Sequence, residues 1–290
     1  LPEALIMVLI ATTFAFLACT QPIMSGSLLG CLLVVLHTLK QLVGTILRIF
    51  KVEWALKTDT MHKTLPLTEP PSIWRVNRSY HLRHHFGDPM AYFGVNFSIL
   101  DKLMKTALSL KGRTIGFANH LNDLEHTLRS ELIQAGGRVI PHHEPIDFEK
   151  TCILIIDISE VKGICPEGLI HQMEAFLSTV HTDEEIVTKE IWLIVSNAEN
   201  AIAWDSLDDL YQRFLSDWIT RRRIDAPCIL RKIVLGSYQD HRQSPNVVSK
   251  SIVSAVQRDI RNIVVRSPGW VYLLQPLKEW MVSVYFRLGQ

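Results

Sequence analysis

Three histidines within five residues, His81, His84 and His85, form the group with the greatest capacity for chemistry in this sequence. Positions i, i+3 and i+4 share one face of a helix, so this spacing directs three imidazoles to the same side. Imidazole binds iron, zinc and copper well, and a metal ion relieves the repulsion that crowded protonated rings would suffer. The spacing therefore predicts a metal site, and a chance grouping on a solvated helix is the alternative.

The residues after this group extend the pattern. The segment 81–106 resembles the last histidine box of the fatty acid hydroxylase/sterol desaturase superfamily. It departs from the family at Leu100, where the family has Trp, and at Met104-Lys105, where the family has Phe-Gly. The shared positions are His81, His84, His85, Phe93-Gly94, Asp101, Leu103 and Thr106. The resemblance implies an integral-membrane di-iron oxygenase that oxidises a C–H bond of a lipid or sterol, with the three histidines as iron ligands and Asp101 at most anchoring their helix.

The family uses three such boxes, and the histidine count here falls short of that. Upstream of His81 there are only His37 and His62, and neither has a second histidine three or four residues away. His37 is predicted either as a lone additional iron ligand or as a buried polar residue of a membrane helix. We expect the chain to be the C-terminal portion of a longer protein; a natural truncation with an incomplete di-iron centre is the alternative.

An uncharged run of about 36 residues lies between Glu3 and Lys40. One bilayer crossing takes ~20 residues, so the run predicts two tight crossings or a re-entrant hairpin. Lys40, Arg48 and Lys51 come after it, and the positive-inside rule then puts the rest of the chain on the cytoplasmic side. The sequence predicts an integral membrane protein whose partners are the membrane and a lipid or sterol; its electron donor is left open.

The second half of the chain alternates short apolar runs with amphipathic segments. This alternation predicts a doubly wound parallel sheet. The expected strands are 114–118, 138–141, 152–157, 191–196, 228–235 and 262–265, and the expected helices are 124–135, 167–180, 207–220 and 247–258. The sequence thus predicts a partial hydroxylase/desaturase-like domain over 1–106, a Rossmann-like domain over 107–266 and an interfacial helical tail over 267–290.

This second domain resembles a short-chain dehydrogenase, and the whole chain resembles the fused sterol-desaturase/short-chain-dehydrogenase proteins. The segments that carry the resemblance are 110–115, 225–236, 258–265 and 276–279. A dinucleotide fold needs glycines in the first strand-to-helix turn, where the backbone approaches the pyrophosphate. This chain has Asn119, Asn122 and Glu125 in the three glycine places. We therefore expect little or no NAD(P) binding.

The catalytic motif of that family, Tyr-x-x-x-Lys, corresponds to Tyr211 followed by Leu215 in the place of the lysine. Without that lysine a tyrosine keeps a pKa near ~10 and is a poor proton-transfer group at neutral pH. Tyr211 is the candidate catalytic residue, with a vestigial role and a partly buried helix position as alternatives. Ser196 could supply the serine of the family, although its spacing to Tyr211 is long.

Three further features carry less chemistry. His142-His143-Glu144 is predicted to be an exposed loop rather than a metal site, and Thr182 to Glu185 a helix cap rather than a cation site. The tail holds Trp270, Tyr272, Trp280, Tyr285 and Phe286 among charged residues, a pattern typical of a membrane interface. A net charge of +1 gives no reason to invoke nucleic acid, and five scattered cysteines show no disulfide pattern.

Three functions from different classes are consistent with these observations. The first is di-iron lipid hydroxylation or desaturation, fused to a degenerate dehydrogenase-like domain. The second is a catalytically inactive, membrane-associated Rossmann scaffold. The third is an NAD(P)-dependent short-chain dehydrogenase or reductase. The sequence favours the first.

Overall fold

The computed structural model describes residues 2–20, 26–50, 66–73, 76–88, 91–92, 98–118, 123–159, 165–196, 207–236 and 244–265, and residues 277–278, 280–282 and 284–286 of the tail. The chain divides into two compact units, Leu1–Thr64 and Leu65–Gln290. This division differs from the boundary expected at residue 106, because the histidine-bearing segment belongs to the second unit.

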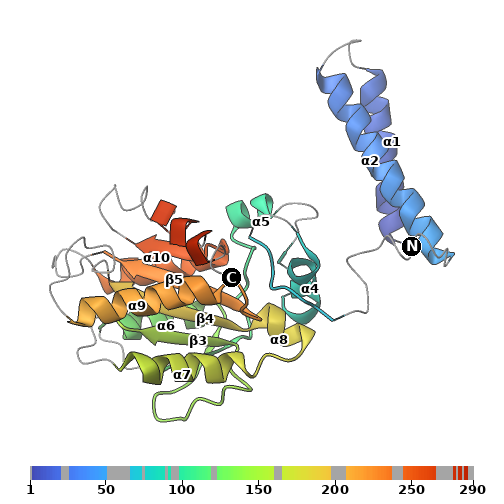
Figure 1. The fold of residues 1–290 in the computed structure, drawn as a ribbon. Helices are drawn as coiled ribbons and strands as arrows, with labels where there is room; N and C mark the ends of the chain where they lie inside the picture. Colours follow the sequence, from blue (N-terminus) through green and yellow to red (C-terminus); the bar gives the residue numbers. More distant parts are fainter. Residues whose placement is uncertain are drawn as a thin grey trace. The chain divides into compact units, whose positions relative to one another are not determined.

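The first unit is a pair of helices, α1 (Pro2–Cys19) and α2 (Gly26–Ile49), which lie side by side (Figure 1). Large apolar side chains face outward, such as Leu9, Phe16 and Leu33, which are 67%, 71% and 58% exposed. Within the described part of the chain, one helical stretch, Ser27–Gly44, is long and apolar enough to cross a membrane, and Val8–Cys19 is a shorter apolar helix.

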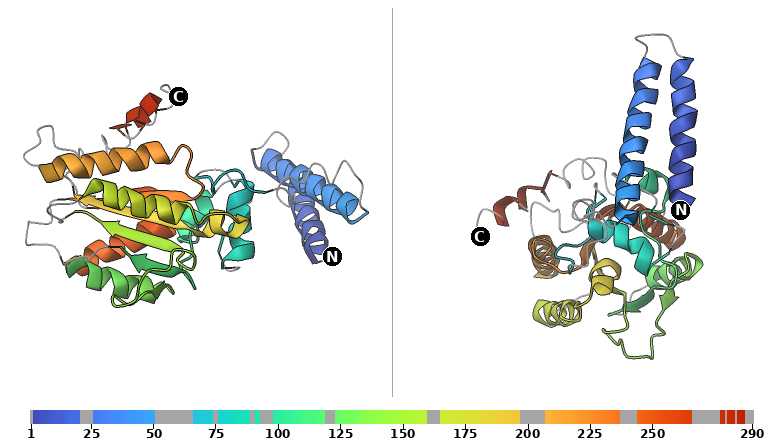
Figure 2. Two further views of the ribbon diagram at one scale, coloured as in Figure 1. Left: turned by 60° about the horizontal axis from the view of Figure 1, so that its bottom comes forward. Right: turned by 90° about the vertical axis from the view of Figure 1, so that its right-hand side faces the viewer.

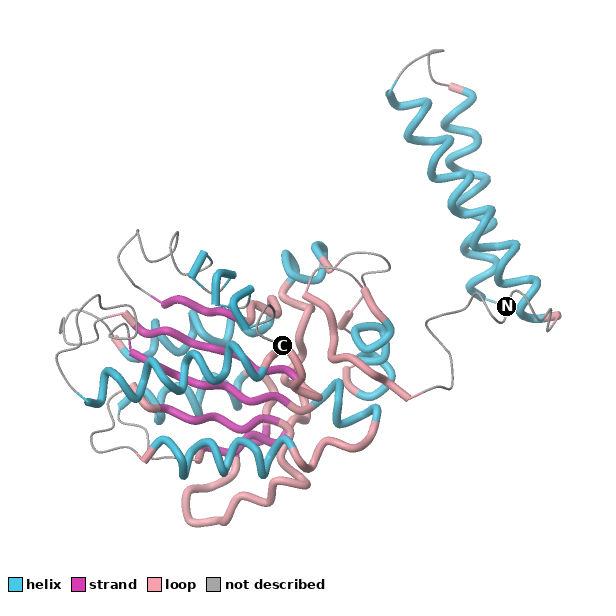
Figure 3. The backbone as a smooth tube through the Cα atoms, in the orientation of Figure 1, coloured by secondary structure: helices cyan, strands magenta, loops and turns pink. Residues whose placement is uncertain are grey.

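The second unit is built on a parallel sheet, whose strands are magenta in Figure 3. The six described strands have the order β2-β1-β3-β4-β5-β6. The strands are β1 (Thr114–Phe117), β2 (Arg138–Val139), β3 (Ile153–Asp157), β4 (Glu190–Ser196), β5 (Ile229–Leu235) and β6 (Asn262–Val265). β2 lies on one side of β1, and β3 to β6 follow one another on the other side, so the strand order changes direction between β1 and β3. Each strand lies within two or three residues of its predicted position. The predicted parallel α/β sheet is confirmed.

Helices cover both faces of this sheet (Figure 2). On one face α6 (Asp123–Gln134) and α10 (Pro245–Gln257) bury Leu128, Leu132 and Ile252 against the strands. On the other face α7 (Pro166–Leu177) and α9 (Leu207–Arg222) bury Phe176 and Leu215. Each strand therefore reads as an apolar run rather than an alternating one, as expected for a strand covered on both faces. The fold is Rossmann-like.

Three short helices complete the second unit: α4 (Arg78–Phe86), α5 (Ile99–Met104) and α8 (Asp183–Thr188). α8 directly precedes β4, so α8 and the α4 that packs on it lie at the amino ends of the strands (Figure 1). Thr182 and Glu185 form a reciprocal capping box at the start of α8, which confirms the predicted helix cap.

Candidate functional site

The predicted metal-binding histidines lie on α4. This helix begins after Asn77, whose side chain accepts a hydrogen bond from the Tyr80 backbone amide. His81 is half-buried and His85 exposed, and their ring centroids are 5.3 Å apart. The side chain of His84 lies outside the described residues, as does that of His37 on α2. Among the described side chains, no group of three His, Cys, Asp or Glu residues could hold a metal ion. The four histidines as iron ligands stay a prediction.

The opposite side of α4 carries a buried arginine that the sequence patterns did not reveal. The Arg83 guanidinium donates hydrogen bonds to the Ala107 carbonyl oxygen at 2.9 Å and to an Asp259 carboxylate oxygen at 3.1 Å. It also lies 3.9 Å from a Glu190 carboxylate oxygen. Arg231 contacts the same two carboxylates, at 2.9 Å and 3.0 Å. These four charged side chains are fully buried, and we call them the amino-edge charge cluster.

Arg83 and Asp259 stay ionised at neutral pH. Burial alone would raise the pKa of Asp259, but Arg83, Arg231 and Arg261 around it lower that pKa to about 2. Burial alone would lower the pKa of Arg83, but the Asp259 carboxylate beside it produces a net rise. The Arg83 guanidinium and the Asp259 carboxylate therefore stabilise each other's charge inside the protein, and this pair attaches α4 to the α/β unit.

Residues shared with the histidine box have structural partners here. Asp101 on α5 accepts hydrogen bonds from the Tyr80 hydroxyl at 2.8 Å and from the Thr106 hydroxyl at 3.0 Å. Burial and the neighbouring Asp101 carboxylate raise the pKa of Tyr80, so its phenol remains protonated and keeps donating. Asp101 thus anchors α4 to α5.

Ligands of open parallel sheets bind at the carboxyl ends of the strands, which is the edge opposite to α4. Ser196 ends β4 at this edge, and its hydroxyl donates to the Gln212 side-chain carbonyl oxygen at 2.7 Å. The Gln212 carbonyl also accepts from the Ser196 backbone amide at 3.0 Å. Gln212 on α9, rather than the neighbouring Tyr211, therefore holds Ser196.

Tyr211 itself is half-buried, and its catalytic role stays a prediction. Leu215, in the place of the family's lysine, is fully buried within the hydrophobic core under α9. A buried leucine cannot contact a cofactor ribose through a charge. The sequence contained one signal for Gln212: it is a polar residue three positions before Leu215, on the same apolar side of the helix.

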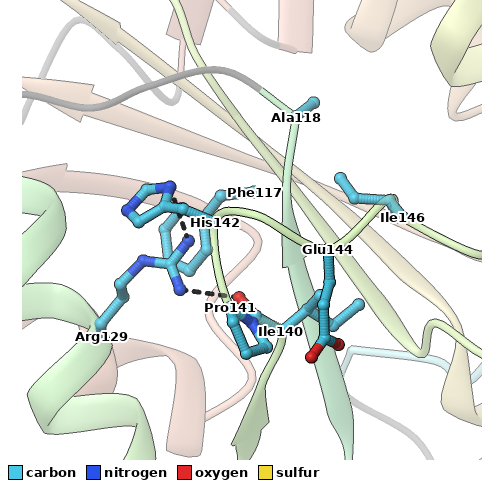
Figure 4. A pocket seen from close by; sticks show the side chains of 8 residues that line it. All are labelled: Phe117, Ala118, Arg129, Ile140, Pro141, His142, Glu144 and Ile146. Atoms are coloured by element: carbon cyan, nitrogen blue, oxygen red, sulfur yellow. Dashed lines mark hydrogen bonds between the residues drawn. The ribbon is translucent and has the colours of Figure 1, made fainter.

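A pocket of about 190 Å³ opens at the ends of β1 and β2 (Figure 4). The Arg129 guanidinium lies 4.5 Å from the centre of the Phe117 ring and donates to the Ile140 carbonyl oxygen at 2.8 Å. The pocket is lined by Phe117, Ala118, Arg129, Ile140, Pro141, His142, Glu144 and Ile146. His143, which the sequence places in an exposed loop, is 83% exposed as predicted.

A buried carboxylate lies beside this pocket. One Glu125 carboxylate oxygen lies 2.6 Å from Arg129 Nε and 2.6 Å from His142 Nε2. Glu125 is only 4% exposed, although it stands where the dehydrogenase pattern has its third glycine. We call Glu125, Arg129 and His142 the Glu125 cluster.

The described residues differ from a dinucleotide site at the third glycine place. The third glycine of the pattern allows close packing of helix on strand, and here a carboxylate fills that space. The Glu125 carboxylate also forms an ion pair with Arg129, whose positive charge could otherwise bind a phosphate. The pocket is smaller than the roughly 300 Å³ at which ligand pockets usually begin. Asn119 and Asn122, the other two glycine places, lie outside the described residues.

Comparison with known proteins gives one informative match. The chain is 34% identical over 277 residues to the monoglucosyldiacylglycerol epimerase of Synechocystis sp., an alignment that covers 79% of this chain and 68% of that protein. No family model matches the chain, and no solved structure matches it. The match gives no support to a sterol desaturase fusion or to a di-iron hydroxylase fold. The chain belongs to the family of the monoglucosyldiacylglycerol epimerase.

Proposed function

We propose that this protein recognises the sugar headgroup of a glycosylated diacylglycerol at a membrane surface, through a short-chain-dehydrogenase-like domain. The observation that carries the proposal is the 34% identity to an enzyme named for its action on monoglucosyldiacylglycerol. The apolar α1–α2 pair supports a location at a membrane, because its outward side chains are those that favour a lipid environment.

Two of the described residues argue against hydride transfer by this chain. Inverting a sugar carbon that bears a hydroxyl requires oxidation to a ketone and reduction from the other face, and NAD(P) supplies this chemistry when it is bound. Glu125 places a buried negative charge beside the nucleotide end of the sheet, and Leu215 removes the cation that would hold the ribose. The protein is therefore proposed to retain the fold and the lipid preference of its family while its own NAD(P) site is closed.

A second candidate is an active NAD(P)-dependent epimerase or reductase of the short-chain dehydrogenase type. The six-stranded parallel sheet and the epimerase relative favour it. Ser196 at the carboxyl end of β4 would then hydrogen-bond the sugar hydroxyl, with Gln212 orienting it. Both candidate functions involve the same glycolipid, and they differ in whether the protein binds NAD(P).

Nucleotide titration separates the two candidates. The full chain in detergent micelles is titrated with NAD⁺ and NADP⁺ by calorimetry, and we expect no saturable binding below the millimolar range. Glu125→Gly frees Arg129 and His142, and we expect about tenfold tighter NADP⁺ binding, equivalent to ~1.4 kcal/mol. Glu131→Gly on the same helix is the matched control for the loss of helix stability. Saturable micromolar binding by the unaltered chain would establish the second candidate instead.

The lipid is tested separately. Nanodiscs that contain monoglucosyldiacylglycerol are compared with nanodiscs of phosphatidylcholine alone, and bound lipid is quantified by mass spectrometry after purification of the full chain. Enrichment of the glycolipid supports the proposal, and equal retention of both lipids contradicts it. Incubation of the same glycolipid with NAD⁺ and analysis of the sugar reports any epimerisation directly.

A further inference from the structure

The short helix α5 exposes an unusual amount of apolar surface. Ile99, Leu100, Leu103 and Met104 are 51%, 67%, 72% and 67% exposed. Positions i, i+1, i+4 and i+5 lie on one side of a helix, so these four side chains form one continuous face. Scattered exposed apolar residues are ordinary, but four contiguous ones on a single turn and a half indicate a contact surface.

The fold holds this face outward. Asp101, on the other side of α5, is 1% exposed and bonded to Tyr80 and Thr106. The Ser98 hydroxyl, just before the helix, donates to the Ile73 carbonyl oxygen at 2.8 Å. Hydrogen bonds from Ser98 and to Asp101 therefore attach the polar side of α5 to the rest of the domain. The apolar face, which we call the α5 face, remains exposed among the described residues.

The exposed charge that α5 itself contributes beside the α5 face is positive. The acidic residue of α5, Asp101, is buried and hydrogen-bonded inward, whereas Lys105 ends the helix as an exposed residue. Lys102 is half-buried, so Lys105 is the basic residue of this segment that is exposed next to the apolar side chains. Apolar side chains next to a lysine match a bilayer, where the former enter the acyl region and the ammonium meets lipid phosphates.

We infer that the α5 face inserts into the bilayer as a second membrane contact, separate from the α1–α2 pair. The partner is the lipid surface itself and not another protein, because the chain already carries an apolar helix pair and a basic residue borders the face. This contact would hold the Rossmann-like domain close to lipid headgroups. It rests on the membrane association within the proposed function.

The test places a fluorophore on the α5 face. Leu103→Cys is made in a chain whose five native cysteines are replaced by serine or alanine, labelled with the environment-sensitive dye NBD, and reconstituted in phosphatidylcholine/phosphatidylglycerol vesicles. Some vesicles carry lipids with a doxyl group on the acyl chain. Ile133→Cys on α6, a residue that is 57% exposed, is the matched control. We expect blue-shifted emission and doxyl quenching at position 103, with neither at position 133.

Three results would overturn the inference. Water-like emission at position 103 in a chain that floats with the vesicles would show that α5 stays outside the bilayer. A blue shift without doxyl quenching would show that protein covers the α5 face instead. A chain that does not float with vesicles refutes the proposed membrane association, and the inference falls with it. Lys105→Glu should at least halve the quenching at position 103 in the anionic vesicles, and unchanged quenching would contradict the role assigned to this lysine.

Discussion

Replacing Arg83 by methionine tests whether the amino-edge charge cluster fixes the histidine-bearing helix to the sheet. The substitution keeps an unbranched apolar stem but shortens the side chain, and it removes the charge and the hydrogen bonds to Ala107 and Asp259. Removing one member of a buried ion pair costs about 3 to 5 kcal/mol, because the remaining charge stays buried without its partner. Arg231 still contacts both carboxylates, so we expect the lower end of this range, about 3 kcal/mol.

The assay is urea unfolding of the full chain in detergent micelles, followed by far-ultraviolet circular dichroism. Arg213→Met is the matched control: Arg213 lies 4.0 Å from Asp217, and both side chains are about a third exposed or more. An exposed pair of this kind contributes under about 0.5 kcal/mol. Equal free energies of unfolding for the two variants would refute the idea that Arg83 attaches α4 to the sheet.

The same variant also shifts the acid response, because removing the Arg83 charge allows the pKa of Asp259 to rise toward its ordinary value. Acid unfolding of Arg83→Met should therefore begin at a higher pH than acid unfolding of the unaltered chain. An unchanged acid midpoint would mean that Arg231 and Arg261 alone hold the carboxylate ionised.

Three further outcomes are expected. The folded pKa of Asp259, about 2, lies below its ordinary value of 3.8, so its stabilising contribution is complete above that value and is lost as the pH falls toward 2. This contribution is about 2 kcal/mol, and in Asp259→Asn the corresponding slope of urea midpoints against pH should disappear. Thr182→Ala, which breaks the capping box of α8, should cost about 1 kcal/mol in thermal unfolding, whereas Thr182→Ser should cost much less. If the histidines of α4 hold iron, mass spectrometry should find less iron in purified His84→Ala; equal iron contents would end that interpretation.

Local sequence patterns were sufficient to predict the sheet. The run Ile153–Asp157 is apolar up to its last residue and has the length of a strand, and Gly136 and Gly137 after α6 mark the end of a helix. Such signals depend on neighbours within a few residues, so they can be recognised without knowledge of the rest of the fold. The cap at Thr182 is of the same kind, since its partner Glu185 is only three residues away.

The site was harder to predict, because its residues come from distant parts of the chain. The three-histidine spacing on α4 suggested chemistry, whereas the contact of that helix with the sheet is made from its buried side, through Arg83. Gln212 beside Ser196, and the Glu125 cluster beside the pocket, were missed for the same reason. Each involves a polar side chain whose partner lies on another element of the fold.

By itself the sequence determined the order of strands and helices, the apolar α1–α2 pair and the loss of the glycine pattern at Glu125. Only the tertiary structure decided which charges are neutralised: Arg83 and Asp259 are 176 positions apart, and their contact exists because the parallel topology brings α4 and the end of α10 to the same edge of the sheet. Hydrophobic periodicity is a local property of the chain, whereas the partner of a buried charge depends on how the whole sheet is connected.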